Sequence, residues 1–188
     1  ISVARANGVD IDLAQTLVGP VQRDGAPMVL RNYSSHEGQP LPLAIYRANT
    51  EPGRPTAPVL VYVHGGGWGG GSLDDRPVDM RWFADRGFLV VSVEYTLSSV
   101  DRPTWDIAPQ QIGCALAWIA GNAADFGGDP SRLALFGESA GGNLALNVSY
   151  MASGGSLQPS CPGKLPRIAA TIAAYPILDA VRLYENDD

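Results

Sequence analysis

The sequence predicts an α/β fold in which a mostly parallel, doubly wound sheet begins with an antiparallel hairpin. Short runs of continuously apolar residues alternate with stretches of helical character, which is typical of parallel strands covered by helices on both faces. Near the start of the chain, two strand-like segments flank a turn-rich segment, which favours an antiparallel pair. The 188 residues, 45% apolar and 17% charged, have an ordinary globular composition.

The beginning of the chain divides into two parts. Residues 1–27 show no clear period, and we expect them to form an arm or a partial cap before the main domain, residues 28–188. The hairpin strands are expected at 28–33 and 41–48, with the turn-rich SSHEGQP between them.

The remaining elements alternate along the chain. Ile112, Leu116 and Ile119 recur at helical spacing in one of three expected crossover helices, which lie at 76–87, 107–124 and 140–151. Four apolar runs predict strands at 59–63, 88–93, 132–136 and 168–175. The last of these would lie unpaired at a sheet edge, which natural proteins avoid, so we expect the sequence to be cut short there.

Composition excludes several classes of protein. The net charge of −6 and the lack of any Lys or Arg run argue against a nucleic-acid partner, and no apolar stretch approaches the roughly 20 residues of a transmembrane segment. Ile1 in place of Met indicates a trimmed N-terminus, which leaves cytoplasmic and exported locations both open. Cys114 and Cys161 have neither metal-ligand nor Cys-x-x-Cys spacing, so we predict no metal site, and a single disulfide between them stays open.

The segment LALFGESAGGNLAL at 133–146 carries the strongest chemical signal. An apolar strand runs into Gly-Glu-Ser-Ala-Gly, and small residues follow from which a helix can continue. A nucleophilic serine at such a turn needs small neighbours, because the turn is strained and lies close to adjacent strands. A serine that only caps the helix is the alternative. Strand, turn and helix together favour Ser139 as a nucleophile.

A second motif, HGGGWGGGS, begins at His64, where the strand expected at 59–63 ends. Consecutive glycines let backbone N–H groups approach a substrate closely, as an oxyanion hole requires. A phosphate loop would need Gly-Lys-Ser/Thr, and a dinucleotide-binding turn would need a helix directly after the glycines. A flexible loop is the other alternative. Because a strand and two helices separate this motif from Ser139, an oxyanion loop is favoured.

The two motifs resemble those of the α/β-hydrolases of the hormone-sensitive-lipase-like esterase group and the related feruloyl-esterase-like hydrolases. The resemblance spans about residues 28–179. It rests on HGGGW at 64–68, FGGDPSRLALFGESAGGNLA at 126–145 and, more weakly, VVSVEYTL at 90–97.

This resemblance implies the α/β-hydrolase fold with Ser139 as the acyl-forming nucleophile. It also implies that the oxyanion donors are the backbone N–H groups of Gly66, Gly67 and Ala140. Trp68, beside the glycine loop, either lines the substrate pocket or belongs to the core. The implied activity is that of a serine carboxylesterase acting on a small-molecule ester, with no metal or organic cofactor.

The resemblance does not supply the rest of a catalytic triad. The family orders its triad as Ser, then Asp or Glu, then His, and this chain has no His after residue 64. By the same resemblance, His64 has a structural role and helps to hold the loop. His36 lies in the hairpin turn, where we expect it to be solvated. Asp179 resembles a position after the next strand rather than the triad acid. We therefore expect acid and base in a C-terminal continuation or a second polypeptide.

Three acidic or polar positions complete the comparison with the family. Glu94 and Thr96 stand where the family often has Asp and Arg, in the wall behind the oxyanion loop, and Glu138 is expected to be structural. The alternative function is not enzymatic: a hydrolase-fold binding module, or an inactive fragment without a working triad. Its only support is that the chain lacks the triad histidine. Peptidase or amidase activity stays open because it uses the same parts.

Overall fold

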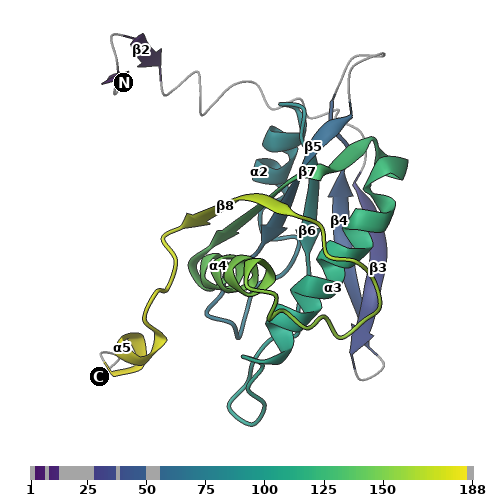
Figure 1. Ribbon diagram of the computed structural model, residues 1–188. Coiled ribbons are helices and arrows are strands. Elements are labelled where there is room, and N and C mark those ends of the chain that lie inside the picture. The colour runs from purple at the N-terminus through teal and green to yellow at the C-terminus, as the bar shows by residue number, and fades with distance from the viewer. Residues whose placement is uncertain (1–2, 7–8, 13–27, 37–38, 50–55, 186–188) are drawn as a thin grey trace.

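The computed structural model describes residues 3–6, 9–12, 28–36, 39–49 and 56–185. Its centre is a six-stranded sheet with strand order β3-β4-β6-β5-β7-β8, covered by helices on both faces (Figure 1). The strands are β3 (Val29–His36), β4 (Gln39–Tyr46), β5 (Ala57–Val63), β6 (Leu89–Val93), β7 (Gly128–Glu138) and β8 (Ile168–Ala174). The helices are α2 (Pro77–Ala84), α3 (Ile107–Asn122), the 3-10 turn η1 (Ala123–Phe126), α4 (Ser139–Ser153) and α5 (Ala180–Glu185).

The sheet is antiparallel at its beginning and parallel afterwards. Strand β4 pairs antiparallel with both β3 and β6, whereas β5 pairs parallel with β6 and β7, and β7 pairs parallel with β8. This arrangement confirms the predicted hairpin and the predicted parallel sheet. The carboxyl ends of β5 and β7, where the two glycine-rich motifs begin, are therefore neighbours at one edge of the sheet.

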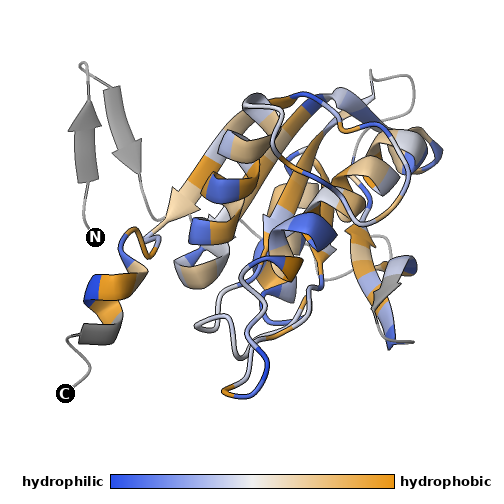
Figure 2. Cartoon of the chain, turned by 60° about the horizontal axis from the view of Figure 1, so that its bottom comes forward, coloured by the Kyte–Doolittle hydropathy of each residue, from blue (hydrophilic) through white to orange (hydrophobic). Residues whose placement is uncertain are grey.

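The central strands are buried on both faces because their side chains alternate between two hydrophobic cores. On β5, Val59, Val61 and Val63 belong to the core under α3 and α4, whereas Leu60 and Tyr62 belong to the core under α2. The continuous apolar run of β5 is the sequence signature of this double burial. Figure 2 shows the same apolar character concentrated in the middle of the sheet.

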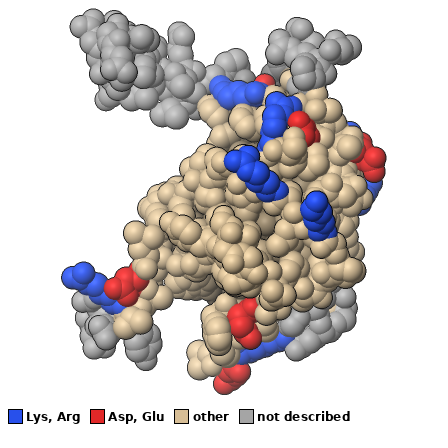
Figure 3. Space-filling model, viewed as in Figure 1, with Lys and Arg blue, Asp and Glu red and all other residues tan. Residues whose placement is uncertain are grey.

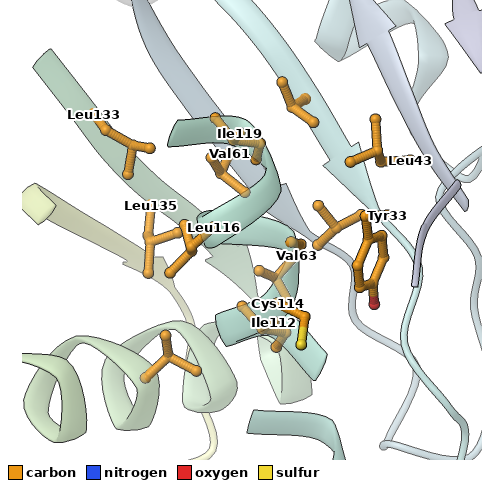
Figure 4. Close-up of a cluster of buried hydrophobic side chains, with 14 of the residues drawn as sticks. Tyr33, Leu43, Val61, Val63, Ile112, Cys114, Leu116, Ile119, Leu133 and Leu135 are labelled. Atoms are coloured by element: carbon orange, nitrogen blue, oxygen red, sulfur yellow. The ribbon is translucent and has the colours of Figure 1, made fainter. Parts of the chain in front are cut away.

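Helix α3 packs on the sheet and is buried on nearly all sides in its middle, residues 111–117. Its residues Ile112, Leu116 and Ile119 are 0–1% exposed, and they lie over valines and leucines of β5 and β7 (Figure 4). Cys114 on the same helix forms a disulfide with Cys161. The disulfide, which the sequence left open, ties the connection between α4 and β8 to α3.

Strand β8 has β7 as its one partner among the described residues, and its apolar side chains are only partly covered, with Ile172 51% exposed.

At the N-terminus, β1 (Val3–Ala6) and β2 (Val9–Asp12) pair antiparallel in a separate two-stranded sheet. Most of residues 1–27 lie outside the described residues, and their predicted role as an arm or partial cap stays a prediction.

Candidate active site

Ser139 stands at the junction between β7, which ends at Glu138, and α4, which begins at Ser139 itself. Its backbone φ is +53°, a left-handed conformation that residues with a side chain rarely adopt and that often marks a functional turn. The Ser139 side chain is half-buried. The sequence predicted a strained strand-to-helix turn at this position, and the structure has this geometry.

The turn is held close to β5 by a glycine. A Cβ atom built on Gly141 would lie 2.2 Å from the carbonyl oxygen of Val63 and 2.3 Å from that of His64. Since no real Cβ approaches backbone oxygen so closely, α4 can start at this position only with glycine there. The close approach places the first turn of α4 directly against the beginning of the HGGG segment.

The glycine loop after β5 bends back on itself beside the turn. The carbonyl of Gly66 accepts hydrogen bonds from the amides of Gly69 and Gly70, at 3.2 and 2.9 Å, and Gly66 and Gly67 have φ values of +109° and +59°. Both glycines are exposed. A Cβ built on Gly65 would lie 3.4 Å from the Cβ of Ser139, so the loop and the serine are in contact.

Ala140 is the second residue of α4. Its N–H group therefore belongs to the first turn of the helix, where backbone donors have no acceptor four residues earlier. Ala140, Gly66 and Gly67 thus follow the carboxyl ends of the neighbouring strands β7 and β5, and their predicted role as oxyanion donors stays a prediction.

His64 is fully buried and has both ring nitrogens engaged. Nδ1 donates to the carbonyl of Gly65 at 2.8 Å, and Nε2 lies 3.0 Å from Oε1 of Glu94. The ring stacks on Tyr95, with the ring centroids 4.3 Å apart, and the Tyr95 hydroxyl donates to the His64 carbonyl. Because neither nitrogen is free to take a proton from Ser139, this geometry supports a structural role for His64.

Glu94 also binds the far end of the glycine segment. Its Oε2 accepts a hydrogen bond from the backbone N–H of Leu73 at 3.1 Å, while the Leu73 carbonyl accepts one from the Ser92 hydroxyl. The carboxylate therefore joins His64 at the start of the loop to Leu73 at its end. Each oxygen of the carboxylate binds one end of the loop, which gives Glu94 a physical role.

Replacing His64 with alanine is expected to lower stability and activity together. The change leaves the Glu94 carboxylate without its buried partner, which lowers the free energy of unfolding by about 3 kcal/mol. It also loosens the loop. We expect a lower urea midpoint, a lower turnover, and a pH–rate profile of unchanged shape. Glu94→Gln, which keeps a hydrogen-bond acceptor, should have a smaller effect. An intact fold with a shifted pH–rate profile would identify His64 as the base instead.

Glu138, next to Ser139, is the centre of a polar network. Its Oε1 accepts hydrogen bonds from the Tyr62 hydroxyl and from Nε of Arg76, both at 3.0 Å. Its Oε2 accepts from Nη2 of Arg76 at 2.9 Å and from the Tyr175 hydroxyl. These contacts join β5, the start of α2 and the end of β8. They agree with the structural role that the sequence assigned to Glu138.

A pocket of about 380 Å³ opens beside the glycine loop, within the usual size range of small-molecule sites. Trp68 lies in its wall and also packs against the hydrophobic core, and its predicted contact with substrate stays a prediction. Asn143, one helical turn after Ser139 and therefore on the same face of α4, also lines it. The remaining lining residues are Gly67, Ser98, Pro103, Thr104, Trp105, Ala108, Pro109, Leu144, Asn147 and Ala180.

Sequence reasoning missed three side chains of this region. Trp105 lines the pocket although it lies in a loop, and its 79% exposed side chain is unusual for tryptophan. Arg76 and Tyr175 bind Glu138 from distant parts of the chain. The sequence offered no signal for these two contacts, because they join residues 37 and 62 positions apart.

Asp179 accepts a hydrogen bond from the backbone N–H of Arg182 in the first turn of α5.

The surface and the helices add two findings about the described part of the chain. No continuous basic band crosses the face drawn in Figure 3, where charged side chains are few among the described residues. None of the described helices has both the length and the apolar character needed to cross a membrane. His36 ends β3, and its side chain lies outside the described residues.

A mostly parallel sheet that presents a left-handed serine at a strand-to-helix turn, beside a glycine loop on the neighbouring strand, defines an α/β-hydrolase. The chain belongs to the BD-FAE family, whose model matches residues 43–188. This finding confirms the family resemblance of the sequence motifs.

Known proteins of similar sequence and structure are esterases. Carboxylesterase NlhH of Mycobacterium tuberculosis is 42% identical over 100 residues, which cover 53% of this chain and 31% of that protein. The crystal structure of esterase LipW from Mycobacterium marinum matches 81% of this chain and 45% of its own, with 35% identity and a TM-score of 0.65. A bacterial heroin esterase matches 89% and 50%, with 26% identity and a TM-score of 0.69. The chain spans about a third of the length of the curated relatives it matches.

Proposed function

We propose that the protein containing this chain is a serine carboxylesterase that cleaves small-molecule esters through an acyl-enzyme intermediate on Ser139. The observation that carries the proposal is the left-handed φ of +53° at Ser139, on a strand-to-helix turn in contact with the glycine loop. A capping serine has no need of this strained conformation. The esterase names of the related proteins support the same reaction class.

In the proposed reaction, Oγ of Ser139 attacks the ester carbonyl carbon and gives its proton to a histidine. The carbonyl oxygen becomes an oxyanion, which accepts hydrogen bonds from the backbone N–H groups of Gly66, Gly67 and Ala140. The C–O bond to the alcohol then breaks, and the histidine returns the proton to the leaving alkoxide. Water then attacks the acyl-serine while the histidine takes its proton. The bond to Oγ breaks, the histidine returns the proton to Oγ, and the acid is released.

The histidine and its acidic partner are proposed to come from a C-terminal continuation or a second polypeptide. His64 is held on both ring nitrogens by Gly65 and Glu94, which supports a base from elsewhere. Among the described residues β8 pairs with β7 alone, and its other edge is where a further strand could pair. No metal or organic cofactor is needed for this reaction.

The proposal is tested by steady-state and rapid-mixing kinetics of the whole protein with 4-nitrophenyl acetate. We expect saturable hydrolysis with an initial burst of 4-nitrophenol whose amplitude is close to one per active site, if deacylation is the slower step. Mild acid quenching should then leave an acetyl group on the peptide that contains Ser139. Hydrolysis with acetyl on another residue, or a burst that leaves no acetyl on the Ser139 peptide, would contradict the acyl-enzyme on Ser139.

Trp105 is proposed to contact the substrate at the mouth of the pocket. Its exposed indole is a large apolar surface that can cover a bound chain. We expect Trp105→Ala to lower kcat/KM for 4-nitrophenyl hexanoate about 10-fold and for the acetate by much less, because only the longer chain reaches the indole. Val100→Ala, a change at a still more exposed residue of the same loop but outside the pocket lining, is the control. Equal effects on both esters would show that Trp105 does not select substrates.

A further inference from the structure

The acidic side chain of Glu138 leaves the backbone at the turn that presents Ser139, next to the start of the glycine loop. Glu138 precedes Ser139 in the chain, and its Cγ lies only 3.5 Å from a Cβ built on Gly65, so its side chain passes next to the glycine loop. Burial by itself would raise the pKa of Glu138, but hydrogen bonds from Tyr175, Arg76 and Tyr62 outweigh burial and hold the pKa below its ordinary value. The group is therefore ionised at neutral pH.

A fixed negative charge at this place opposes the proposed reaction. Ester cleavage on Ser139 builds negative charge on the carbonyl oxygen at the glycine loop, and like charges in a partly buried site repel each other strongly. The Glu138 side chain is only 14% exposed, so water screens its charge poorly. The two tyrosine hydroxyls donate hydrogen bonds to the carboxylate but carry no charge to cancel it.

Arg76 is the positive group that faces this carboxylate. It stands immediately before α2, and its guanidinium binds both oxygens of Glu138, with Nε to Oε1 at 3.0 Å and Nη2 to Oε2 at 2.9 Å. This two-point geometry is the strongest form of an arginine–carboxylate pair. Asp79, whose Oδ2 lies 3.8 Å from Nη1 of Arg76, is a weaker and more exposed partner of the same guanidinium.

We infer that Arg76 is a positioning residue of the active site, which neutralises Glu138 so that the oxyanion on the acylating substrate can form. The inference rests on the proposed function. It assigns to Arg76 a role in the transition state rather than in substrate binding. A purely structural arginine would support the fold through the same contacts, but it would not make the activity depend on the charge of Glu138.

The test compares Arg76→Met, Glu138→Gln and the double variant in the whole protein, with 4-nitrophenyl acetate as substrate. Methionine keeps most of the unbranched apolar part of the side chain and removes the charged guanidinium. We expect Arg76→Met to lower kcat about 10- to 100-fold with KM within about twofold, since uncompensated charge acts on the transition state. Arg76→Lys, which keeps the charge but not the fork, should keep most of the activity.

The decisive result is rescue by the second substitution. The double variant Arg76→Met with Glu138→Gln should recover most of the kcat that Arg76→Met loses, although it has fewer native contacts than either single variant. Arg132→Met is the matched control, because Arg132 is as exposed as Arg76 and pairs with Asp129 at 2.9 Å far from Ser139. We expect its kcat to be unchanged, and urea unfolding should show that every variant is folded.

The outcomes distinguish a positioning role of Arg76 in the reaction from a purely structural role. A double variant that is no faster than Arg76→Met, or an Arg76→Met enzyme with unchanged kcat, would overturn the inference and leave the proposed esterase intact. A wild-type protein without Ser139-dependent hydrolysis would overturn the proposed function, and the inference with it. If Arg76→Met fails to fold, Glu138→Gln alone gives the answer, because charge compensation predicts retained kcat for that variant and a structural network predicts its loss.

Discussion

Replacing Ser139 with alanine is expected to lower kcat/KM for a short-chain aryl ester by a factor of about 10⁴ or more, because the variant has no atom to form the acyl bond. The fold should be retained. Removing one hydroxyl from a half-buried side chain leaves the left-handed turn and its glycine contacts in place. Initial rates of 4-nitrophenyl acetate hydrolysis measure the loss, and urea unfolding checks the fold.

Ser149 provides the matched control for this experiment. It lies on the same helix α4, and its hydroxyl is hydrogen-bonded to that of Thr171 rather than facing the glycine loop. Ser149→Ala should cost about 1 kcal/mol of stability and leave the rate unchanged. Full activity in highly purified Ser139→Ala protein would show that another group carries the chemistry.

The second large effect is expected from Gly66→Ala in the glycine loop. A Cβ on Gly66 would lie 2.2 Å from the carbonyl oxygen of Gly70, and the φ of +109° is unfavourable for alanine. The loop must therefore change shape, which would displace the N–H groups of Gly66 and Gly67, the proposed oxyanion donors. Loss of an oxyanion donor typically lowers kcat by about 10²–10³, and we expect a reduction of this size with KM little changed.

The control for Gly66→Ala is the same substitution at a glycine where the added Cβ would contact no other atom. Gly121 lies near the end of α3, and no atom is within 4 Å of a Cβ built on it. Gly121→Ala should keep full activity and gain about 0.5–1 kcal/mol of stability, as expected in a helix. If Gly66→Ala kept the wild-type kcat, the loop would not be the oxyanion site.

The elements of the fold could be predicted from the sequence because each has a local signature. The apolar run of β5 follows from burial on both faces of the sheet. The helical spacing of Ile112, Leu116 and Ile119 follows from their packing together in one core. The strained turn at Ser139 was predicted because strand, small residues and helix all lie within a few positions of it. These patterns depend on neighbours in the chain.

The partners of the site could not be predicted, since they depend on neighbours in space. Arg76 pairs with Glu138 only because the start of α2 comes to lie beside the end of β7. Glu94 binds His64 across two parallel strands, and nothing in VVSVEYTL signals this contact. Likewise, the apolar run of β8 predicts a buried strand, yet burial also requires a second neighbour, which the described residues do not provide.

The most direct test is the intact mass of the protein before and after a fluorophosphonate probe, followed by location of the adduct on a peptide. We predict one adduct per chain on Ser139, in a protein heavier than the 19.8 kDa of these 188 residues or accompanied by a second polypeptide. A pure 19.8 kDa chain that takes no adduct would contradict the serine esterase and would favour a hydrolase-fold binding module or an inactive fragment.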